Sequence, residues 1–212
     1  MNKVVIFDWG GIVESHEYDM KDLNDAKIRM IKRIDSSLSD EEILSKWINK
    51  TPDGVNIGTV SDLKEVKRYV EFLQKSLGIN ISYKDFVNLY EEEFKAVKYY
   101  KDVVDYAHSL KSRCKIAILS NLMYFDKKRI NDQYDLSKFD YIYLSFEIGM
   151  RKPDEKIYKY VLDDLKVKPE DILFIDDDYQ NILAAKKCGW NTCLAFGYEL
   201  DKIKKSVDDF LG

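Results

Sequence analysis

The sequence predicts an α/β protein in which a parallel β-sheet carries an inserted bundle of helices. Residues 4–7 are apolar and mostly β-branched, and glycines follow shortly after, a pattern typical of a buried strand. Residues 15–99 show only helical periodicity, whereas strands and helices alternate from residue 100 onward. We therefore expect a core domain of residues 1–14 and 100–212 and a helical domain of residues 15–99.

The expected helical domain contains four helices. Apolar residues recur at helical spacing from Asp19 to Asp35. Ser39 and Glu42 have the spacing of a capping box, which predicts the start of a second helix. A loop is expected at Thr51–Val60. The third helix is expected to begin at Ser61 and the fourth at Ser82.

In the second half of the chain, the alternation of strands and helices predicts right-handed crossovers within one parallel sheet. The expected strands are Lys115–Asn121, Tyr141–Phe146, Ile172–Asp176 and Asn191–Phe196. The expected helices are Asp102–Ser112, one near Asp126, Asp154–Leu165, Gln180–Cys188 and one at the end of the chain. The first strand must join this sheet to bury its apolar side chains, so the bundle is inserted above the carboxyl ends of the strands.

The composition restricts the partners of the protein. Of 212 residues, 34 are basic and 38 acidic, and no basic run provides the long-range attraction that nucleic acids require. No apolar run is long enough to span a membrane, and the chain begins with a strand rather than a secretory stretch. Cys114, Cys188 and Cys193 lack metal-ligand spacing and are expected to be reduced thiols. We expect a cytoplasmic protein with no nucleic-acid or membrane partner.

Polar residues follow four of the expected strands. They are Asp8, Ser120 with Asn121, Arg151 with Lys152, and Asp176 to Asp178. The carboxyl ends of parallel strands share one edge of the sheet, so these residues should converge on one crevice. Paired carboxylates can hold Mg²⁺, while a lysine and a serine can bind phosphate. Asp8 could attack phosphorus and form an aspartyl-phosphate, although by itself it fits a turn or a helix cap equally well.

Four segments, FDWGG, LSN, GMRKPD and FIDDDYQNILAAKKCGW, resemble in order and spacing the four motifs of the haloacid dehalogenase-like superfamily. The resemblance covers the whole chain when the helical insert is counted as the cap of that superfamily, and it implies a Rossmann-like core. Small bacterial sugar-phosphate phosphatases, including glucose-1-phosphate phosphatases, are the most similar in these motifs. The resemblance therefore implies a Mg²⁺-dependent phosphatase that acts on a small phosphorylated metabolite.

The same resemblance implies a role for each residue of the motifs. Asp8 would be the nucleophile, and Lys152 would assist it. Phosphate would be bound by Gly10, Gly11, Ser120, Asn121 and Lys152. The ligands of Mg²⁺ would be Asp8, the carbonyl oxygen of Gly10, Asp176 and Asp177, with Asn181 orienting the carboxylates.

Gly10 departs from the family pattern, because most phosphatases of this superfamily have a second aspartate there that acts as general acid and base. Such help is worth roughly a hundred- to ten-thousand-fold in rate. The substrate could have a good leaving group, such as an anomeric or acyl phosphate, or Glu14 or His16 could replace the aspartate. Alternatively, the protein is slow, or only binds a phosphorylated ligand or a partner.

Two further activities are compatible with parts of the pattern. A metal-independent 2-haloacid dehalogenase would also use Asp8 as nucleophile, but the paired aspartates of the fourth motif argue against it. Phosphoryl transfer within a sugar, as in mutases, relies on the aspartate that Gly10 replaces.

Overall fold

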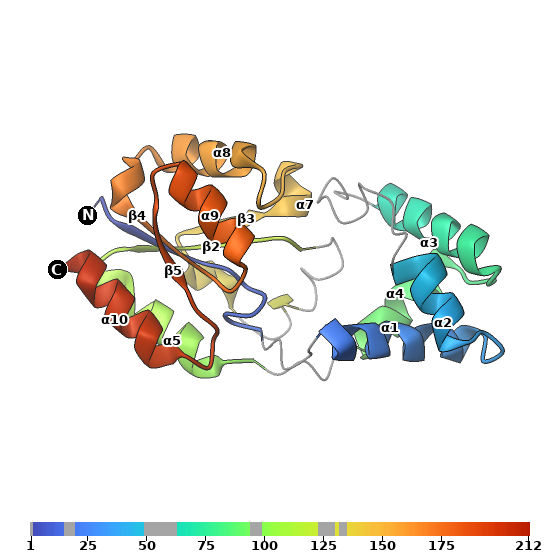
Figure 1. The fold of residues 1–212 in the computed structure, drawn as a ribbon. Helices are drawn as coiled ribbons and strands as arrows, with labels where there is room; N and C mark the ends of the chain where they lie inside the picture. Colours follow the sequence, from blue (N-terminus) through green and yellow to red (C-terminus); the bar gives the residue numbers. More distant parts are fainter. Residues whose placement is uncertain (1, 15–19, 49–62, 94–98, 123–129, 132–134) are drawn as a thin grey trace.

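A computed structural model describes residues 2–14, 20–48, 63–93, 99–122, 130–131 and 135–212 (Figure 1). It contains a five-stranded sheet in the order β3-β2-β1-β4-β5, in which every neighbouring pair is parallel. The strands are β1 (Val4–Phe7), β2 (Lys115–Ser120), β3 (Tyr141–Leu144), β4 (Ile172–Asp176) and β5 (Asn191–Leu194). The predicted α/β class and parallel sheet are confirmed, and β1 is the central strand.

Helices cover both faces of the sheet. The apolar side chains of β1 point alternately to the two faces, so each face needs helices to bury it. Val5 and Phe7 pack with helices α5 and α10, whereas Val4 and Ile6 pack with α8 and α9. The elements of this part of the chain are α5 (Lys101–Ser109), η3 (Leu110–Ser112), η4 (Leu136–Lys138), α7 (Ser145–Ile148), α8 (Glu155–Leu165), η5 (Pro169–Asp171), α9 (Tyr179–Lys187) and α10 (Leu200–Leu211). Since both faces are covered, β1 is fully buried, as its apolar sequence predicts.

The helices between β1 and α5 form a bundle around a hydrophobic cluster of their own. They are α1 (Met20–Ile34), α2 (Asp40–Ile43), η1 (Leu44–Ile48), α3 (Leu63–Leu77) and α4 (Tyr83–Glu93). Ser39 and Glu42 form both hydrogen bonds of the predicted capping box at the start of α2. The expected loop at Thr51–Val60 and the expected helix near Asp126 lie outside the described residues.

The third strand is shorter than the sequence predicts. The prediction of a strand up to Phe146 is wrong, because β3 ends at Leu144 and α7 begins at Ser145. The Ser145 hydroxyl accepts a hydrogen bond from the Leu122 N–H at 3.0 Å and donates one to the Leu122 carbonyl at 3.1 Å. This buried side chain bonds to the segment after β2 while its own backbone turns into the helix.

The last strand also ends early, at Leu194 instead of Phe196. The Ala195 N–H still donates to the Asp176 carbonyl at 3.1 Å, but the Phe196 N–H donates to the Glu199 carboxylate at 2.9 Å. The backbone therefore leaves the sheet after Ala195 because a local side chain takes over its hydrogen bond.

The chain leaves and re-enters the sheet domain at adjacent points. The Tyr100 N–H donates to the Val13 carbonyl at 2.8 Å, and Glu14 and Tyr99 form an antiparallel bridge. The buried indole of Trp9 donates from Nε1 to Glu14 Oε2 at 3.0 Å and lies edge-on to the Tyr99 ring, with centroids 6.3 Å apart. Trp9 thus links the turn after β1 to both segments that lead to the bundle.

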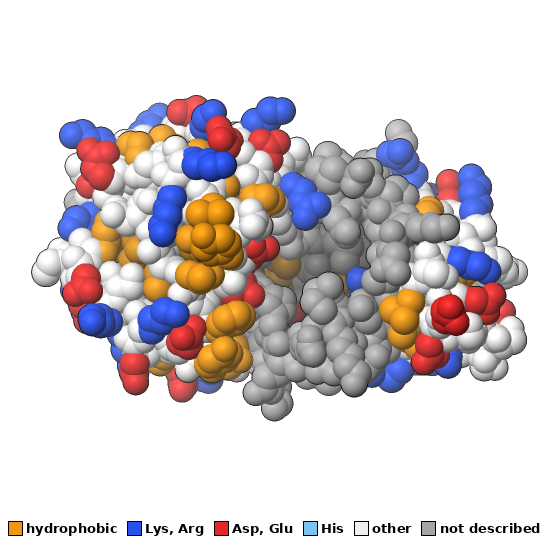
Figure 2. Space-filling model, viewed as in Figure 1, with side chains coloured by type: hydrophobic (Ala, Val, Ile, Leu, Met, Phe, Trp, Pro, Cys, Tyr) orange, Lys and Arg blue, Asp and Glu red, His pale blue; other side chains and the backbone are white. Residues whose placement is uncertain are grey.

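The surface carries both signs of charge. Lys and Arg side chains are interspersed with Asp and Glu over both parts of the face drawn in Figure 2. None of the described helices combines the length and the apolar character needed to cross a membrane. Cys114, Cys188 and Cys193 are free thiols, as expected.

Candidate active site

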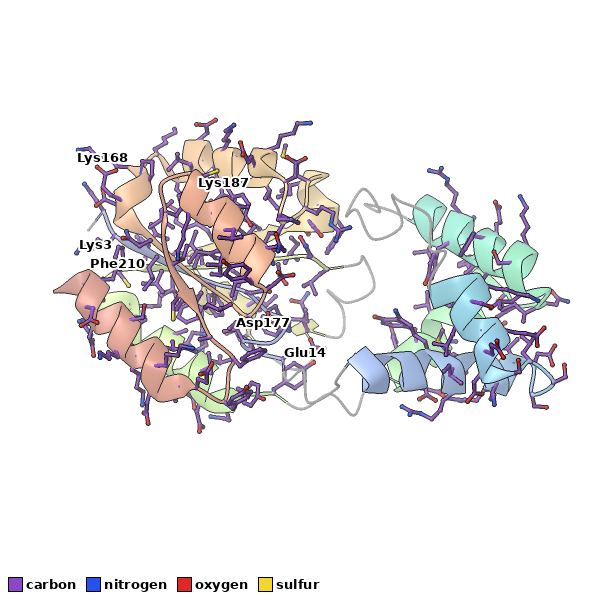
Figure 3. All side chains as sticks on the ribbon, in the orientation of Figure 1. Lys3, Glu14, Lys168, Asp177, Lys187 and Phe210 are labelled. Atoms are coloured by element: carbon purple, nitrogen blue, oxygen red, sulfur yellow. The ribbon has the colours of Figure 1, made fainter. Side chains whose placement is uncertain are left out.

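Three carboxylates meet at the carboxyl ends of β1 and β4. One oxygen each of Asp8, Asp176 and Asp177 lies within 4.8 Å of the other two. The parallel pairing explains this, because the Asp8 N–H donates to the Ile175 carbonyl at 2.9 Å. Asp177 and Glu14 lie at the end of the sheet that faces the bundle, opposite Lys3 and Phe210 (Figure 3). Ligands on opposite sides of Mg²⁺ are about 4 Å apart, so the cluster has a suitable size for this ion.

Lys152 lies between two of these carboxylates. Its Nζ is 2.9 Å from Asp8 Oδ2 and 2.6 Å from Asp176 Oδ2, and the residue is only 1% exposed. Burial by itself would lower the pKa of Lys152, but the charges of Asp8 and Asp176 outweigh burial and raise it. The ammonium group therefore stays protonated and is held beside Asp8.

The remaining negative charge of the cluster is only partly compensated. Burial raises the pKa of Asp176 to about 6, although Lys152 opposes this shift. Burial and then the charge of Asp176 raise the pKa of Asp177 to about 7. Within the described part of the chain, Lys152 contacts Asp8 and Asp176, and a bound divalent cation would further relieve both the desolvation and the repulsion of the carboxylates.

Asn181 and the start of α9 hold Asp176 in place. Asp176 Oδ1 accepts from the Asp178 N–H at 2.7 Å, and the Asn181 amide nitrogen lies 3.1 Å from each carboxylate oxygen of Asp176. The Asp178 side chain accepts from the Gln180 N–H at 2.7 Å and caps α9. The Asn181 amide therefore contacts the Asp176 carboxylate, and its orienting role stays a prediction.

The glycine turn after β1 packs directly on Asp177. Gly11 has a φ of +70°, and a Cβ built on it would lie 2.2 Å from Asp177 Cγ. The Gly11 carbonyl accepts from the Gly197 N–H at 2.8 Å, and Gly10 forms a bridge with Glu14. Within this turn, the Trp9 N–H donates to Asp8 Oδ1 at 2.6 Å. Only a residue without a side chain allows this approach of backbone and carboxylate.

Ser120 and Asn121 lie at the end of the neighbouring strand β2. Ser120 is 2% exposed. The side chain of Asn121 makes two hydrogen bonds with the main chain of Lys152, each 2.9 Å long. The structure thus brings the predicted residues of all four motifs to one edge of the sheet, whereas His16 lies outside the described residues.

Two hydrogen-bonded anchors beside the site were not predicted from the sequence. Ser145 anchors the segment after β2, and the indole of Trp9 bonds to Glu14. A serine at the end of an apolar strand is a usable signal for such an anchor, because buried hydroxyls need a partner. The indole bond depends on the path of the chain around the turn, so it has no local sequence signal.

A comparison with family models identifies the class of this site. The model of the haloacid dehalogenase-like hydrolases matches residues 23–195. The chain belongs to this family. The family suggested by the four motifs is confirmed, and the protein is a hydrolase of the haloacid dehalogenase-like type.

A curated relative of this hydrolase matches along almost the whole chain. The D-ribitol-5-phosphate phosphatase of Bacteroides thetaiotaomicron is 25% identical over 208 residues, which cover 91% of each chain. Drimenol cyclase of Aspergillus calidoustus is 33% identical over 78 residues, and bifunctional epoxide hydrolase 2 of Rattus norvegicus is 45% identical over 56 residues. These two matches cover 37% and 26% of this chain but only 14% and 10% of the relatives.

Solved structures of the same family share the fold. A Porphyromonas gingivalis protein described as a predicted hydrolase of the haloacid dehalogenase-like (HAD) family superposes with a TM-score of 0.72 at 22% identity, and the match covers 97% of each chain. A HAD family enzyme of Bacteroides thetaiotaomicron, solved with magnesium and inorganic phosphate, has a TM-score of 0.70 at 20% identity over 90% of this chain and 92% of that one.

Proposed function

We propose that this hydrolase is a Mg²⁺-dependent phosphatase that cleaves a small phosphorylated metabolite through an aspartyl-phosphate on Asp8. The observation that carries the proposal is the meeting of Asp8, Lys152, Asp176 and Asp177 at one edge of the sheet. The similarity to a phosphatase of D-ribitol 5-phosphate and to a solved structure with magnesium and phosphate bound supports it.

The residues present fit Mg²⁺, which prefers oxygen ligands and keeps several waters. Asp8, Asp177 and the carbonyl oxygen of Gly10 would bind it directly. Asp176 would bind it through water, because each of its oxygens already accepts two hydrogen bonds from protein donors, whereas each oxygen of Asp8 has one such partner among the described residues. When bound, Mg²⁺ supplies positive charge that offsets the charge of the phosphoryl group.

In the proposed reaction, an oxygen of the Asp8 carboxylate attacks phosphorus in line. The new O–P bond forms while the bond between phosphorus and the ester oxygen breaks, and the departing oxygen takes up a proton. Water then hydrolyses the aspartyl-phosphate, which releases phosphate and restores Asp8. Lys152 neutralises charge beside Asp8 throughout, while Ser120 and the backbone N–H groups of the glycine turn, including Gly10 and Gly11, bind phosphate oxygens.

The proton for the departing oxygen does not come from position 10, where glycine has no side chain. Among the two substitutes suggested by the sequence, Glu14 lies within the described residues, and its carboxylate is held by Trp9 at 3.0 Å. We infer a preference for substrates with good leaving groups, since their departure needs less protonation.

The helical bundle would act as the cap over this site. Its separate hydrophobic cluster supports the proposed division into residues 15–99 and the remaining core. A cap at this edge of the sheet limits the site to small substrates and excludes water during the reaction. The D-ribitol-5-phosphate phosphatase among the relatives supports a sugar phosphate as substrate, and the leaving-group argument favours one whose phosphate lies on the anomeric carbon.

An assay with an aryl phosphate tests the proposal. The wild-type protein should release phosphate with Mg²⁺ and stop when the metal is chelated, whereas Asp8→Asn should fold but be inactive. A panel of sugar, alditol and acyl phosphates then identifies the substrate class. Binding of these compounds without turnover by the wild-type protein, at any Mg²⁺ concentration, would favour the binding protein and refute the phosphatase.

A further inference from the structure

The side chain of Asn121 is bonded to one residue through both of its polar groups. Its Nδ2 donates to the Lys152 carbonyl at 2.9 Å, and its Oδ1 accepts from the Lys152 N–H at 2.9 Å. The two residues are 31 positions apart in the chain. Because two hydrogen bonds join the same pair of groups, they fix both the position and the orientation of the Lys152 main chain relative to the Asn121 amide.

Lys152 needs such an attachment because its own segment is irregular. It lies between α7 and α8, where the described backbone has no helix or strand to hold it. Nevertheless, its Nζ must lie within hydrogen-bond distance of both Asp8 and Asp176. The Arg151 Nε–H adds a longer contact to the Lys152 carbonyl, at 3.3 Å.

We propose that Asn121 is a positioning residue that acts through Lys152 and does not itself bind phosphate. The LSN pattern predicts Asn121 as a phosphate ligand, but its carbonyl oxygen and one of its N–H groups are committed to Lys152. Asn121 follows β2, and β2 pairs with β1, the strand that carries the nucleophile. Its two hydrogen bonds therefore hold Lys152 at a set position relative to Asp8. The inference rests on the proposed phosphatase activity, because kcat/KM of that activity is the quantity that reports a displacement of Lys152.

Ser145 provides a matched structural control. Like Asn121, it makes two hydrogen bonds to the main chain next to the site, both with Leu122, and it is 1% exposed. It does not contact Lys152 among the described hydrogen bonds. Ser145→Ala therefore removes the same number of side chain to main chain bonds from the same region without releasing the lysine.

A double-mutant cycle tests the proposal with an aryl phosphate and Mg²⁺. Asn121→Ala should lower kcat/KM by about 10- to 100-fold when Lys152 is present, the cost typical of groups that orient a functional side chain. In the Lys152→Met background, the same substitution should change kcat/KM by less than about twofold, because the group that it positions is gone. Ser145→Ala should have the same small effect in both backgrounds. Lys152→Gln replaces Lys152→Met if the latter does not fold.

A second measurement does not depend on activity. Hydrogen exchange of the Lys152 amide should become at least about tenfold faster in Asn121→Ala, because its acceptor is removed, and should be unchanged in Ser145→Ala. Equal losses of kcat/KM from Asn121→Ala with and without Lys152 would show that Asn121 contacts the substrate and would overturn the inference. Unchanged exchange at Lys152 would also overturn it. An inactive wild-type protein with faster Lys152 exchange in Asn121→Ala would refute the phosphatase but not the attachment.

Discussion

Replacing Gly11 by alanine should disable the metal site while leaving the fold intact. With a φ of +70°, an alanine in this left-handed conformation costs about 1 to 2 kcal/mol. Its Cβ would also lie 2.2 Å from Asp177 Cγ, whereas ordinary contact begins at 3.4 Å, so the carboxylate must retreat by about 1.2 Å. A displacement of this size in a catalytic group can cost about 100-fold in rate. We therefore expect Gly11→Ala to lose about 100-fold in Mg²⁺-dependent kcat/KM and to bind Mg²⁺ more weakly.

Gly78 offers the matched control for this prediction. Its φ is +72°, and a Cβ there meets nothing within 4 Å, so Gly78→Ala carries the same backbone cost without the clash. Urea unfolding gives the loss in free energy of unfolding for both variants, and calorimetric titration gives their Mg²⁺ affinities. If Gly11→Ala keeps the Mg²⁺ affinity and kcat/KM of Gly78→Ala, the contact with Asp177 has no functional consequence and the reasoning is refuted.

Three further substitutions probe the same edge of the sheet. Lys152→Met should destabilise the protein by about 3 to 5 kcal/mol in urea, because two buried carboxylates lose their cation; a loss below about 1 kcal/mol would contradict the buried ion pairs. Asp177→Asn should raise the melting temperature of the metal-free protein by relieving charge repulsion and abolish the stabilisation by added Mg²⁺; persistence of that stabilisation would exclude Asp177 as a ligand. Trp9→Phe should lower the free energy of unfolding by about 1 to 3 kcal/mol, because the partly buried Glu14 carboxylate loses its donor, whereas Glu14→Gln, which keeps an acceptor, should cost less in the same measurement.

The sequence by itself determined the order of the elements and the site to which they lead. A short β-branched segment at 4–7 can be buried only inside a sheet, and alternating strands and helices leave a parallel sheet as the simple solution. Because parallel strands end at the same edge, the sequence alone predicts that Asp8, Lys152 and Asp176 lie close together. The ends of β3 and β5 could not be predicted in this way, since Ser145 bonds to Leu122 in another segment and the Glu199 carboxylate accepts from the Phe196 N–H.

Only the tertiary structure decided how the site is held. Two of its contacts join different segments of the chain: Asn121 bonds to Lys152, and Gly11 packs on Asp177. A third, the hydrogen bond from Trp9 to Glu14, depends on the path of the turn after β1. Periodicity and spacing describe what each segment does with its own neighbours. They carry no information about which side chain lies within 3 Å of another segment's main chain, because that distance depends on how the loops close around the sheet.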